Sequence, residues 1–386
     1  MNKNNIVVLK GIGIRVPVEE IGGNEPTLTN FVEQLVPLSN ELYVILRDSP
    51  AKFPDKVHLI KIKCVGKRDW ILISIFRFLL TQLKICFNLY KISRDIDIVI
   101  LYTGVKPFVL PILCSKLFRK KTVICSTGVI TKRGLAELGL LSYYIFKVLE
   151  EINFLLVDRI AVESPIAIDL MGLNRFRKKI IVTSAMYIDT NIFKITKDIS
   201  KRKNLVGYIG RLAEGKGIEN FIQAIPLILE KRDDLEFLIG GDGSLFNKIK
   251  DKLEMANLTE KVKLTGWIPH DELSKYLNEL KLFILPSYME GLPCTLQEAM
   301  ACGAIVLATP VGGIPDVIKD GKTGFILENN SPECIAKNVI MALEHPNLDE
   351  IVKNAQKLIE EEYAYEPLVK KLNDSLDELI EKSLSS

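Results

Sequence analysis

The chain has 386 residues, of which 48% are hydrophobic and 26% charged, and its formal net charge at pH 7 is +3. These values are ordinary for a large globular protein, and the length favours two domains of about 150–200 residues. The seven Cys form no CxxC pair and have no ligand spacing with the three His, which argues against a zinc site. We therefore expect free, buried thiols in a reducing compartment. The apolar run at residues 6–9 is too short for a signal peptide.

The charge is unevenly distributed along the chain. Residues 1–195 hold 28 Lys and Arg against 17 Asp and Glu, a net of +11, and residues 196–386 hold the remaining 23 and 31, a net of −8. A basic half favours an anionic partner: a membrane surface, a phosphorylated acceptor or nucleic acid. Nucleic acid is the least favoured, because the basic residues are not interleaved with an aromatic stacking platform.

Short apolar segments alternate with helical patterns along the whole chain. The predicted strands are residues 6–9, 42–46, 58–62, 98–102, 122–125, 159–162, 205–209, 236–239, 262–265, 282–285 and 305–308. The predicted helices are residues 29–35, 70–90, 105–117, 145–156, 218–230, 245–256, 271–280, 296–301 and 366–382. This alternation predicts an α/β protein with two Rossmann-like, doubly wound parallel sheets, each binding ligands at its strand carboxyl ends. The polar segment 194–203 places the boundary between domains 1–195 and 196–364.

The first glycine-rich turn, Gly22-Gly23, separates the first strand from a helix. Glycine lets a ligand approach the backbone, and the N-terminus of the next helix favours negative charge. A simple loop is the alternative explanation. Gly11-Ile12-Gly13 is not a dinucleotide fingerprint, because the third glycine and its spacing are missing.

Residues 70–90 form a very apolar helical segment that basic residues surround. Arg77 and Lys84 interrupt the apolar run, and a bilayer span needs about 20 nearly uncharged residues, so a transmembrane helix is rejected. Two interpretations remain: a helix that lies on a membrane surface, and a core helix packed on a sheet.

Glycine-rich turns follow the strands of the second half. Arg211 and Lys216 come directly after strand 205–209, before a helix, where two cations suit a diphosphate; a solvated basic loop is the alternative. In the next turn, Gly241 permits close backbone approach and Asp242 is placed to cap the following helix. Further turns, each common when taken alone, occur at residues 266–269 and 311–325.

Residues 283–327 are the most informative stretch of the chain. Glu290 and Glu298 flank a Gly-Leu-Pro turn between the predicted strand and a helix, for which Thr295 is the expected N-cap and Gly303 the expected stop. The turn presents unpaired N–H groups and a positive dipole end, which suit a phosphate or a sugar oxygen. An ordinary αβ unit with an acid near the helix N-terminus is the alternative.

The ordered series of these motifs resembles the family 4 (group 1) retaining glycosyltransferases, which have the GT-B architecture of two Rossmann-like domains. The resemblance spans nearly the whole chain and is strongest after residue 205. The matching positions are Gly22-Gly23, Gly210-Arg211, Lys216-Gly217, Gly240-Gly241-Asp242-Gly243, Gly266, Glu290-Gly291-Leu292-Pro293, Glu298-Ala299, Gly312-Gly313-Ile314-Pro315-Asp316, Gly321 and Gly324.

The resemblance implies a hexosyltransferase-type enzyme (EC 2.4) whose donor is a nucleoside diphosphate sugar and which needs no metal cofactor. It assigns Arg211, Lys216 and Glu290 to catalysis, the two cations holding the diphosphate and Glu290 contacting the donor sugar. Glu298 would bind the ribose. The remaining donor-binding positions that it implies are Gly23, Gly210, Gly241, Asp242, Gly266, Trp267, Gly291, Leu292, Pro293, Thr295 and Leu296. It also implies that helix 365–386 returns to the first domain.

The sequence departs from the family pattern in two places, and the first of them leaves the donor sugar and acceptor activation open. Ser126-Thr127-Gly128 stands where family members often have His-Gly, and segment 184–193 replaces the common Asn-Gly-Val-Asp linker. No His is assigned to the site, and His270 is expected to be an exposed neighbour of a helix cap. Asp95-Ile96-Asp97 resembles a metal clamp but precedes its strand, whereas a clamp should follow one.

Three alternatives to a transferase remain. A GT-B sugar-nucleotide epimerase would need acid and base groups in the first domain, and a catalytically silent, membrane-associated subunit would not need the intact charged residues. An NAD-dependent oxidoreductase lacks its fingerprint. For a transferase, the basic first half favours a lipid-linked or otherwise anionic hydroxyl acceptor at the cytoplasmic membrane face, as in envelope or surface polysaccharide or glycolipid synthesis.

Overall fold

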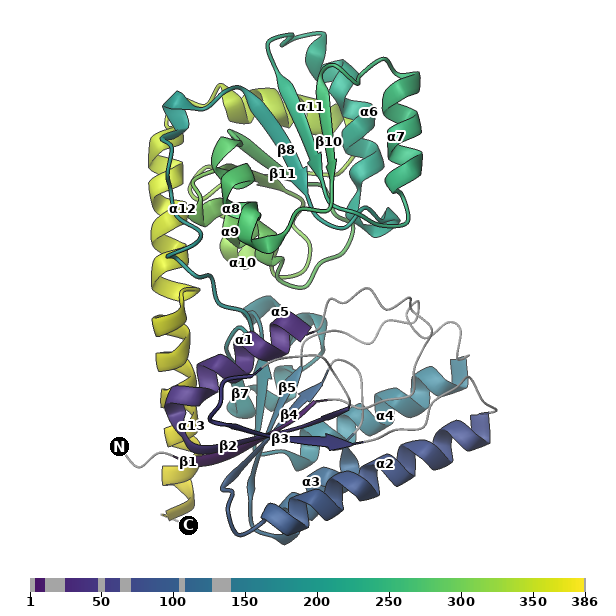
Figure 1. Ribbon diagram of the computed structural model, residues 1–386, viewed down its shortest axis with the longest axis vertical. Coiled ribbons are helices and arrows are strands. Elements are labelled where there is room, and N and C mark those ends of the chain that lie inside the picture. The colour runs from purple at the N-terminus through teal and green to yellow at the C-terminus, as the bar shows by residue number, and fades with distance from the viewer. Residues whose placement is uncertain are drawn as a thin grey trace. The chain divides into compact units, whose positions relative to one another are not determined.

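The chain folds into two compact units, each built around one parallel sheet (Figure 1). The computed structural model describes residues 4–10, 25–47, 53–62, 71–103, 108–126 and 140–384. Met1–Met186 together with Leu368–Ser386 make the first unit, and Tyr187–Pro367 make the second.

The sheet of the first unit has seven strands. In spatial order they are β3 (Val57–Ile62), β2 (Ser39–Arg47), β1 (Asn4–Lys10), β4 (Ile98–Thr103), β5 (Lys121–Ser126), β6 (Arg159–Val162) and β7 (Ile180–Val182). Every pairing is parallel, which confirms the prediction from strand–helix alternation. The sequence prediction lacks β7, because three residues are too few to show a strand pattern.

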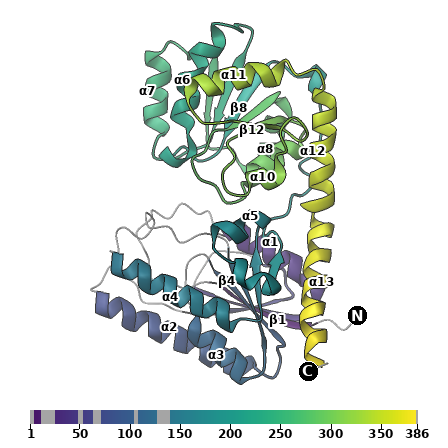
Figure 2. The same ribbon diagram turned by 180° about the vertical axis from the view of Figure 1, so that it is seen from behind.

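Helices cover both faces of this sheet (Figures 1 and 2). They are α1 (Glu25–Leu35), α2 (Ile71–Ile92), α3 (Val109–Leu117), α4 (Leu140–Leu156), α5 (Pro165–Leu170) and α13 (Tyr365–Leu384). The core on one face contains Phe31 of α1 and Leu372 of α13. The core on the other contains Ile85 of α2, Ile112 of α3 and Phe154 of α4. None of the described helices combines the length and the hydropathy of a membrane-crossing segment.

Strand β4 shows why the strands are continuous apolar runs. Ile98 and Ile100 point into the core under α1 and α13, whereas Val99 and Leu101 point into the core under α2, α3 and α4. A parallel strand that is covered on both faces must be apolar at every position, because successive side chains point to opposite faces.

The sheet of the second unit has six strands, all paired in parallel. In spatial order they are β10 (Val262–Gly266), β9 (Glu236–Gly240), β8 (Leu205–Ile209), β11 (Leu282–Leu285), β12 (Ile305–Ala308) and β13 (Phe325–Ile326). The helices are α6 (Ile218–Leu229), α7 (Phe246–Met255), α8 (His270–Glu279), α9 (Cys294–Ala301), α10 (Ile314–Val317), α11 (Pro332–Leu343) and α12 (Leu348–Glu362).

The segment that the sequence places at the domain boundary packs on the second unit, which begins at Tyr187 rather than at residue 196. The guanidinium of Arg202 is buried and donates hydrogen bonds to the carbonyl oxygens of Leu280 and Cys302, at 2.8 and 2.6 Å. The backbone N–H of Thr196 donates to Asn278 at 2.8 Å. These bonds bind the segment tightly to the second sheet although its composition is polar.

Candidate functional site

The second sheet reverses its direction of growth between β8 and β11. Numbered along the chain, its strands lie in the order three-two-one-four-five-six, so β8 and β11 are spatial neighbours whose connections leave the sheet on opposite sides. Open parallel sheets bind ligands at such a switch point, beyond the strand carboxyl ends. Arg211 and Lys216 follow β8, and Glu290 follows β11, so the topology brings residues 74 positions apart to one place.

Lys216 and Glu290 form a bidentate ion pair at this point. The Lys216 Nζ donates to Oε1 and Oε2 of Glu290, both at 2.8 Å, and the Ser287 hydroxyl donates to Oε1 at 2.7 Å. The Glu290 side chain is only 7% exposed, whereas that of Lys216 is 28% exposed. A buried carboxylate needs such a partner because its desolvation is otherwise costly. The ammonium has three N–H donors, so one remains for a ligand.

The loop after β11 is held against its neighbours by the backbone. The Tyr288 N–H donates to the Gly215 carbonyl at 3.0 Å, which joins it to the loop after β8, and the Gly313 N–H donates to the Gly291 carbonyl at 2.7 Å. Gly312 has φ +58, and a Cβ there would overlap the Glu290 carbonyl oxygen. The predicted Gly312-Gly313 turn therefore lies directly against the Glu290 turn, which is a physical reason for the two motifs to occur together.

The three other glycine-rich turns also meet, at the ends of β8, β9 and β10. Gly210 donates to the Gly240 carbonyl at 3.0 Å, and Gly241 donates to the Gly266 carbonyl at 2.7 Å. Gly241 has φ +124, and a Cβ there would overlap the Gly210 carbonyl oxygen. Among the described residues the Arg211 guanidinium has no ion-pair partner, and the Arg211 carbonyl accepts a hydrogen bond from the buried Tyr208 hydroxyl at 2.9 Å.

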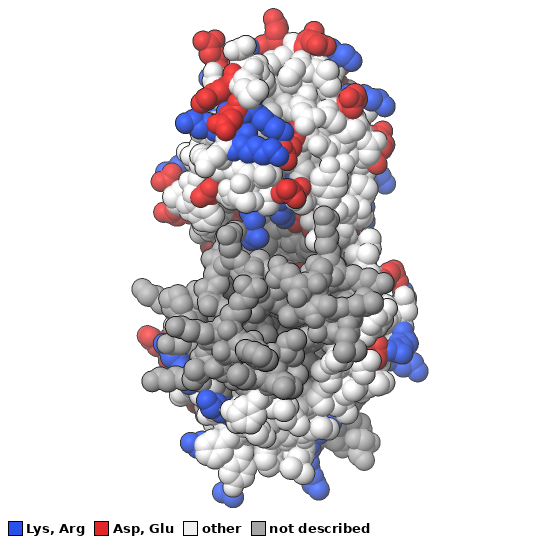
Figure 3. All heavy atoms as spheres, turned by 90° about the vertical axis from the view of Figure 1, so that its right-hand side faces the viewer, with Lys and Arg blue, Asp and Glu red and all other residues white. Residues whose placement is uncertain are grey.

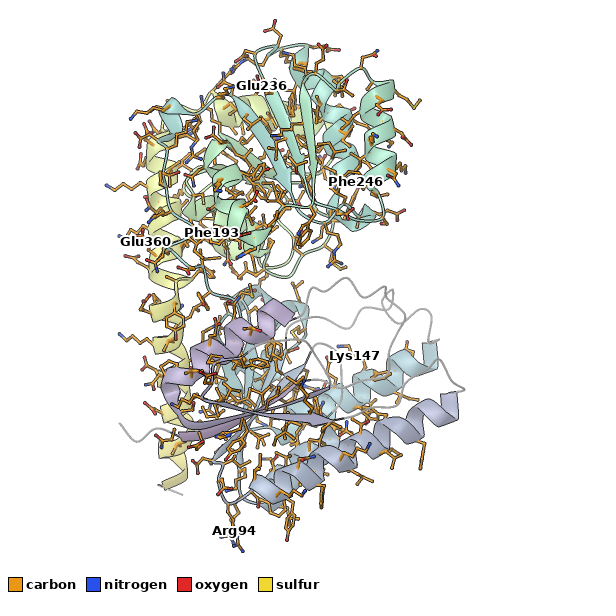
Figure 4. The ribbon with its side chains drawn as sticks, in the orientation of Figure 1. Arg94, Lys147, Phe193, Glu236, Phe246 and Glu360 are labelled. Carbon is orange, nitrogen blue, oxygen red and sulfur yellow. The ribbon has the colours of Figure 1, made fainter. Side chains whose placement is uncertain are left out.

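Glu298 has a partner that the sequence prediction lacks. Its side chain is 6% exposed, and its Oε1 lies 2.9 Å from the Nε2 of His270. The hydrogen bond to Glu298 raises the pKa of His270 above its usual value. The ring of Phe193, labelled in Figure 4, contacts the His270 ring edge-on with centroids 5.2 Å apart. Within the described residues Glu298 Oε2 accepts no protein hydrogen bond, so this oxygen can accept one from a ligand.

Several expectations about the α9 turn need correction. The helix begins at Cys294 with Pro293 in the N-cap position, so Thr295 is not the cap, and Glu298 lies in the second turn of the helix. Leu296 is fully buried in the core, which leaves only its backbone for a ligand. Gly303 has φ +76 directly after the C-cap Cys302, as its predicted role as a stop requires.

The remaining predicted positions differ from the Lys216–Glu290 ion pair in their contacts and exposure. Asp242 does not cap α7, whose N-cap is Leu245; its Oδ1 accepts from the Gly243 N–H at 2.7 Å. Trp267 is 73% exposed after β10, and Leu292 packs partly on the core. Gly23 lies outside the described residues.

Sequence reasoning missed His270 and Ser287. His270 follows a Pro at a helix start, a pattern that shows no contact with a residue 28 positions later. Ser287 lies three residues before Glu290, and only the folded loop turns its hydroxyl back onto the carboxylate. Within the described residues, no group of three or more His, Cys, Asp or Glu is placed to hold a metal ion.

Comparisons with known proteins agree with this geometry. Residues 189–363, nearly all of the second unit, match the family model described as glycosyl transferases group 1. An uncharacterized glycosyltransferase of Methanocaldococcus jannaschii is 26% identical over 98% of this chain and 100% of its own length. An amylovoran biosynthesis glycosyltransferase of Erwinia amylovora is 30% identical over 44% of each chain. The solved structure of Anabaena HepE with UDP is similar in fold, with a TM-score of 0.74, 17% identity, and 97% and 100% of the two chains covered.

The second unit thus carries a group 1 glycosyltransferase domain, and the protein is a glycosyltransferase with the GT-B fold. The two Rossmann-like sheets expected from the sequence are confirmed. Neither the epimerase nor the catalytically silent subunit is favoured by these comparisons, because the family model and the named relatives are glycosyltransferases.

Proposed function

We propose that this GT-B glycosyltransferase moves a hexosyl unit from a nucleoside diphosphate sugar to a hydroxyl acceptor, with retention of configuration at the anomeric carbon. The observation that carries the proposal is the Lys216–Glu290 ion pair at the switch point of the second sheet. Arg211 lies on the same loop as Lys216, and its guanidinium has no ion-pair partner among the described residues. A cation that keeps one N–H available, beside a buried carboxylate, can hold a diphosphate and a sugar hydroxyl at once.

Protein groups along this edge of the second sheet are complementary to a nucleoside diphosphate sugar. Lys216 and Arg211 would take the diphosphate oxygens, since charge-assisted bonds to phosphate are the strong ones. The N-terminus of α9, which begins at Cys294, adds backbone N–H groups and a positive dipole end. Glu298 Oε2 would accept from a ribose hydroxyl. Support for a nucleotide donor also comes from the structures of Anabaena HepE, which were determined in complex with UDP and with UDP-glucose.

The transfer step follows from where the negative charge develops. The bond between the anomeric carbon and the diphosphate oxygen breaks, and its electron pair goes to the diphosphate. The acceptor oxygen bonds to the same face of that carbon, and the acceptor proton passes to the departing phosphate oxygen. Lys216, Arg211 and the α9 N–H groups stabilise the charge on the diphosphate in the transition state. We propose that these fixed charges suffice and that no metal ion is required.

For the acceptor, we propose a lipid-linked hydroxyl compound at the cytoplasmic membrane face, in envelope or surface polysaccharide or glycolipid synthesis. The net charge of +11 on residues 1–195 supports an anionic surface as the place of reaction. The Erwinia relative, named for amylovoran biosynthesis, supports a polysaccharide product.

A ligand screen followed by a transfer assay tests the proposal. A thermal-shift screen against UDP-, GDP- and ADP-sugars should identify one donor that raises the melting temperature, because a ligand selective for the native state stabilises it. With that donor, Glu290→Gln should lower kcat/KM at least about 100-fold at an unchanged circular dichroism spectrum. The matched control is Glu279→Gln, which breaks the exposed Lys197–Glu279 pair in the same unit and should leave transfer unchanged.

The stereochemistry and metal dependence are tested with the same reaction. Proton NMR of the first product should show the anomeric configuration of the donor, and a chelator should leave the rate unchanged. A product of inverted configuration would overturn the retaining assignment. Transfer at the wild-type rate by Glu290→Gln would remove the ion pair from the mechanism.

A further inference from the structure

The outward side of α2 in the first unit is apolar. Its exposed side chains Phe76, Leu79, Leu80, Leu83, Phe87 and Tyr90 recur every three or four residues, so they form one stripe along the helix, called here the α2 face. Leu83 is 57% and Phe87 58% exposed. Soluble monomers rarely expose contiguous apolar patches of this kind without a binding role.

The inward side of α2 shows that this pattern is not an ordinary core helix. Ile85 and Leu89 pack into the core below the sheet, but Thr81 and Gln82 are buried beside them. A surface helix normally puts its apolar side chains inward and its polar ones outward. Here two polar side chains are turned inward while six large apolar ones are turned out. Packing on the sheet therefore explains only the inward half of the helix.

The apolar surface continues over the neighbouring helices. Helix α3 contacts both α2 and α4 in the layer that covers this face of the sheet (Figure 1). Leu117 of α3 is 78% exposed, and Val148 of α4 is 59% exposed. More than half of the large apolar side chains exposed in the described part of the chain belong to these three helices.

Cations border the α2 face. Lys84 and Lys91 of α2 are exposed, and their spacing of seven places both along one edge of the stripe. Arg94 follows the helix end and points away from the sheet in Figure 4. In Figure 3, Lys and Arg side chains stand out around the lower end of the first unit. The Lys91 ammonium lies over the Phe87 ring, 4.6 Å from its centroid, so charge and apolar surface are adjacent.

The two acidic side chains of α4 are each paired with a cation outside α2. On α4, Glu150 pairs with Lys147 at 3.0 Å and Glu151 pairs with Arg175. A stripe of aromatic and leucine side chains with basic residues at its edge fits the boundary between the acyl chains and the head groups of an anionic bilayer. A second copy of this chain would bring the same cations together, which is unfavourable.

We infer that the α2 face docks the first unit on the surface of a bilayer containing anionic lipid. Helix α2 lies in the plane of the interface, its leucine and aromatic side chains reach the acyl boundary, and Lys84 and Lys91 reach the anionic head groups. This deepens the proposed function, on which it rests for the location of the acceptor, by naming the surface that makes the membrane contact.

Vesicle binding by the full chain tests the inference. The wild-type protein should co-sediment with vesicles of phosphatidylcholine and phosphatidylglycerol, and much less with phosphatidylcholine alone. The double variant Leu83→Glu/Phe87→Glu should lower the partition coefficient at least about tenfold, because it removes buried apolar surface and adds repulsion. Lys84→Gln/Lys91→Gln should lower it about fivefold per charge at low salt and less at high salt.

The control is Met255→Glu on α7 of the second unit, which is 85% exposed and should bind vesicles like the wild type. Circular dichroism melting checks that each variant is folded. Equal vesicle binding by the wild type and by Leu83→Glu/Phe87→Glu would overturn the inference. A second outcome would also overturn it: light scattering shows a wild-type dimer, Leu83→Glu/Phe87→Glu is a monomer, and neither protein binds vesicles.

The sugar-nucleotide thermal shift separates this inference from the proposed function. The residues proposed to bind the sugar nucleotide lie in the second unit, so Leu83→Glu/Phe87→Glu should keep the wild-type thermal shift. Loss of vesicle binding with an intact shift supports the docking surface. A wild-type protein that binds vesicles but shows no thermal shift with any sugar nucleotide would contradict the donor assignment and still support the membrane surface.

Discussion

The two units share one strand order and use it for different purposes. In both sheets the first six strands lie in the order three-two-one-four-five-six, and the first unit adds β7. The switch point of the second sheet carries Lys216 and Glu290, held 2.8 Å apart. In the described part of the first unit, the distinctive feature is instead the outer surface of a helix, the α2 face. The common topology therefore supplies the positions, and the loop or surface residues decide the chemistry.

A lysine in each unit makes the contrast concrete. Lys179 of the first unit donates its ammonium N–H groups to the carbonyl oxygens of Phe154, Leu155 and Val157, at 3.2, 2.7 and 2.8 Å, and so closes the C-terminal end of α4. Lys216 of the second unit binds a carboxylate and keeps a donor for a ligand. Lys179 therefore stabilises a helix C-terminus, whereas Lys216 is a candidate for ligand binding.

The largest expected effect tests this contrast directly. Lys216→Ala should lower kcat/KM at least about 100-fold, or about 2.7 kcal/mol, because the diphosphate loses a fixed cation. Lys179→Ala should lower the free energy of unfolding by about 1–3 kcal/mol through its lost carbonyl bonds, with transfer at 25 °C unchanged. Steady-state kinetics and denaturant unfolding measure the two effects.

A second variant keeps stability and catalysis apart. Lys216→Ala also leaves Glu290 buried without its cation, which should cost stability. Adding Glu290→Gln should restore stability but not transfer. Restored transfer in that double variant would mean that the ion pair is structural and that the contrast with Lys179 is wrong.

The next effect concerns the glycine turn beneath Glu290. Gly312→Ala puts a Cβ onto the Glu290 carbonyl oxygen at φ +58, so it should cost several kcal/mol and weaken donor binding. Gly321→Ala has a similar φ, +66, but nothing within 4 Å of its Cβ, and should cost only about 1–2 kcal/mol, with donor binding unchanged. Urea unfolding and donor titration compare them, and equal losses in both would show that backbone strain, not the Glu290 turn, is responsible.

The sequence predicted much of the fold because burial imposes a pattern on it. Strands covered on both faces must be apolar at every position, so runs such as Leu282–Leu285 and Ile305–Ala308 were found with their observed bounds. Strand β13, of two residues, and helix α10, of four, are too short to show a period. The predicted domain boundary at residue 196 lies after Tyr187, where the second unit begins. The polar segment around Arg202 belongs to that unit because backbone carbonyls bind the Arg202 guanidinium, a contact that composition does not reveal.

The candidate site was predicted as a set of residues but not as a set of contacts. Motif order indicated Lys216, Glu290 and Glu298, yet nothing in the spacing shows that Lys216 contacts Glu290 or that His270 contacts Glu298. Those pairings depend on which strands are spatial neighbours, which follows from the three-two-one-four order. The donor-binding roles of these residues remain predictions.

A third prediction concerns a carboxyl group of the first unit that follows β6. Burial raises the pKa of Glu163 to about 7 from the model-compound value of 4.5. The folded state therefore favours the protonated form, so its contribution to stability is full below pH 4.5 and is lost as the pH rises through about 7. Glu163→Gln removes this titration and should gain stability over wild type between pH 5 and pH 8, by at most about 3 kcal/mol.

Fluorescence can assign that change to one unit. The chain has two Trp, so in a Trp267→Phe background Trp70 of the first unit reports alone. Unfolding by denaturant at pH 5 and pH 8 gives the difference. Asp55→Asn, a change at an exposed carboxyl of the same unit, should show no such gain. A constant difference between Glu163→Gln and wild type across this range would show that the carboxyl does not titrate there.

The smallest effect belongs to His270 in the second unit. The hydrogen bond to Glu298 raises the pKa of His270, so the pair stabilises the fold fully below the ordinary His value near 6.5 and loses that contribution as the pH rises through the higher folded value. Because the His270 side chain is 66% exposed, we expect less than about 1 kcal/mol. NMR titration can follow its C2 proton, since the chain has only three His and His270→Ala identifies the signal. Glu298→Gln should lower the midpoint, and an unchanged midpoint would mean that the pair does not exist in solution.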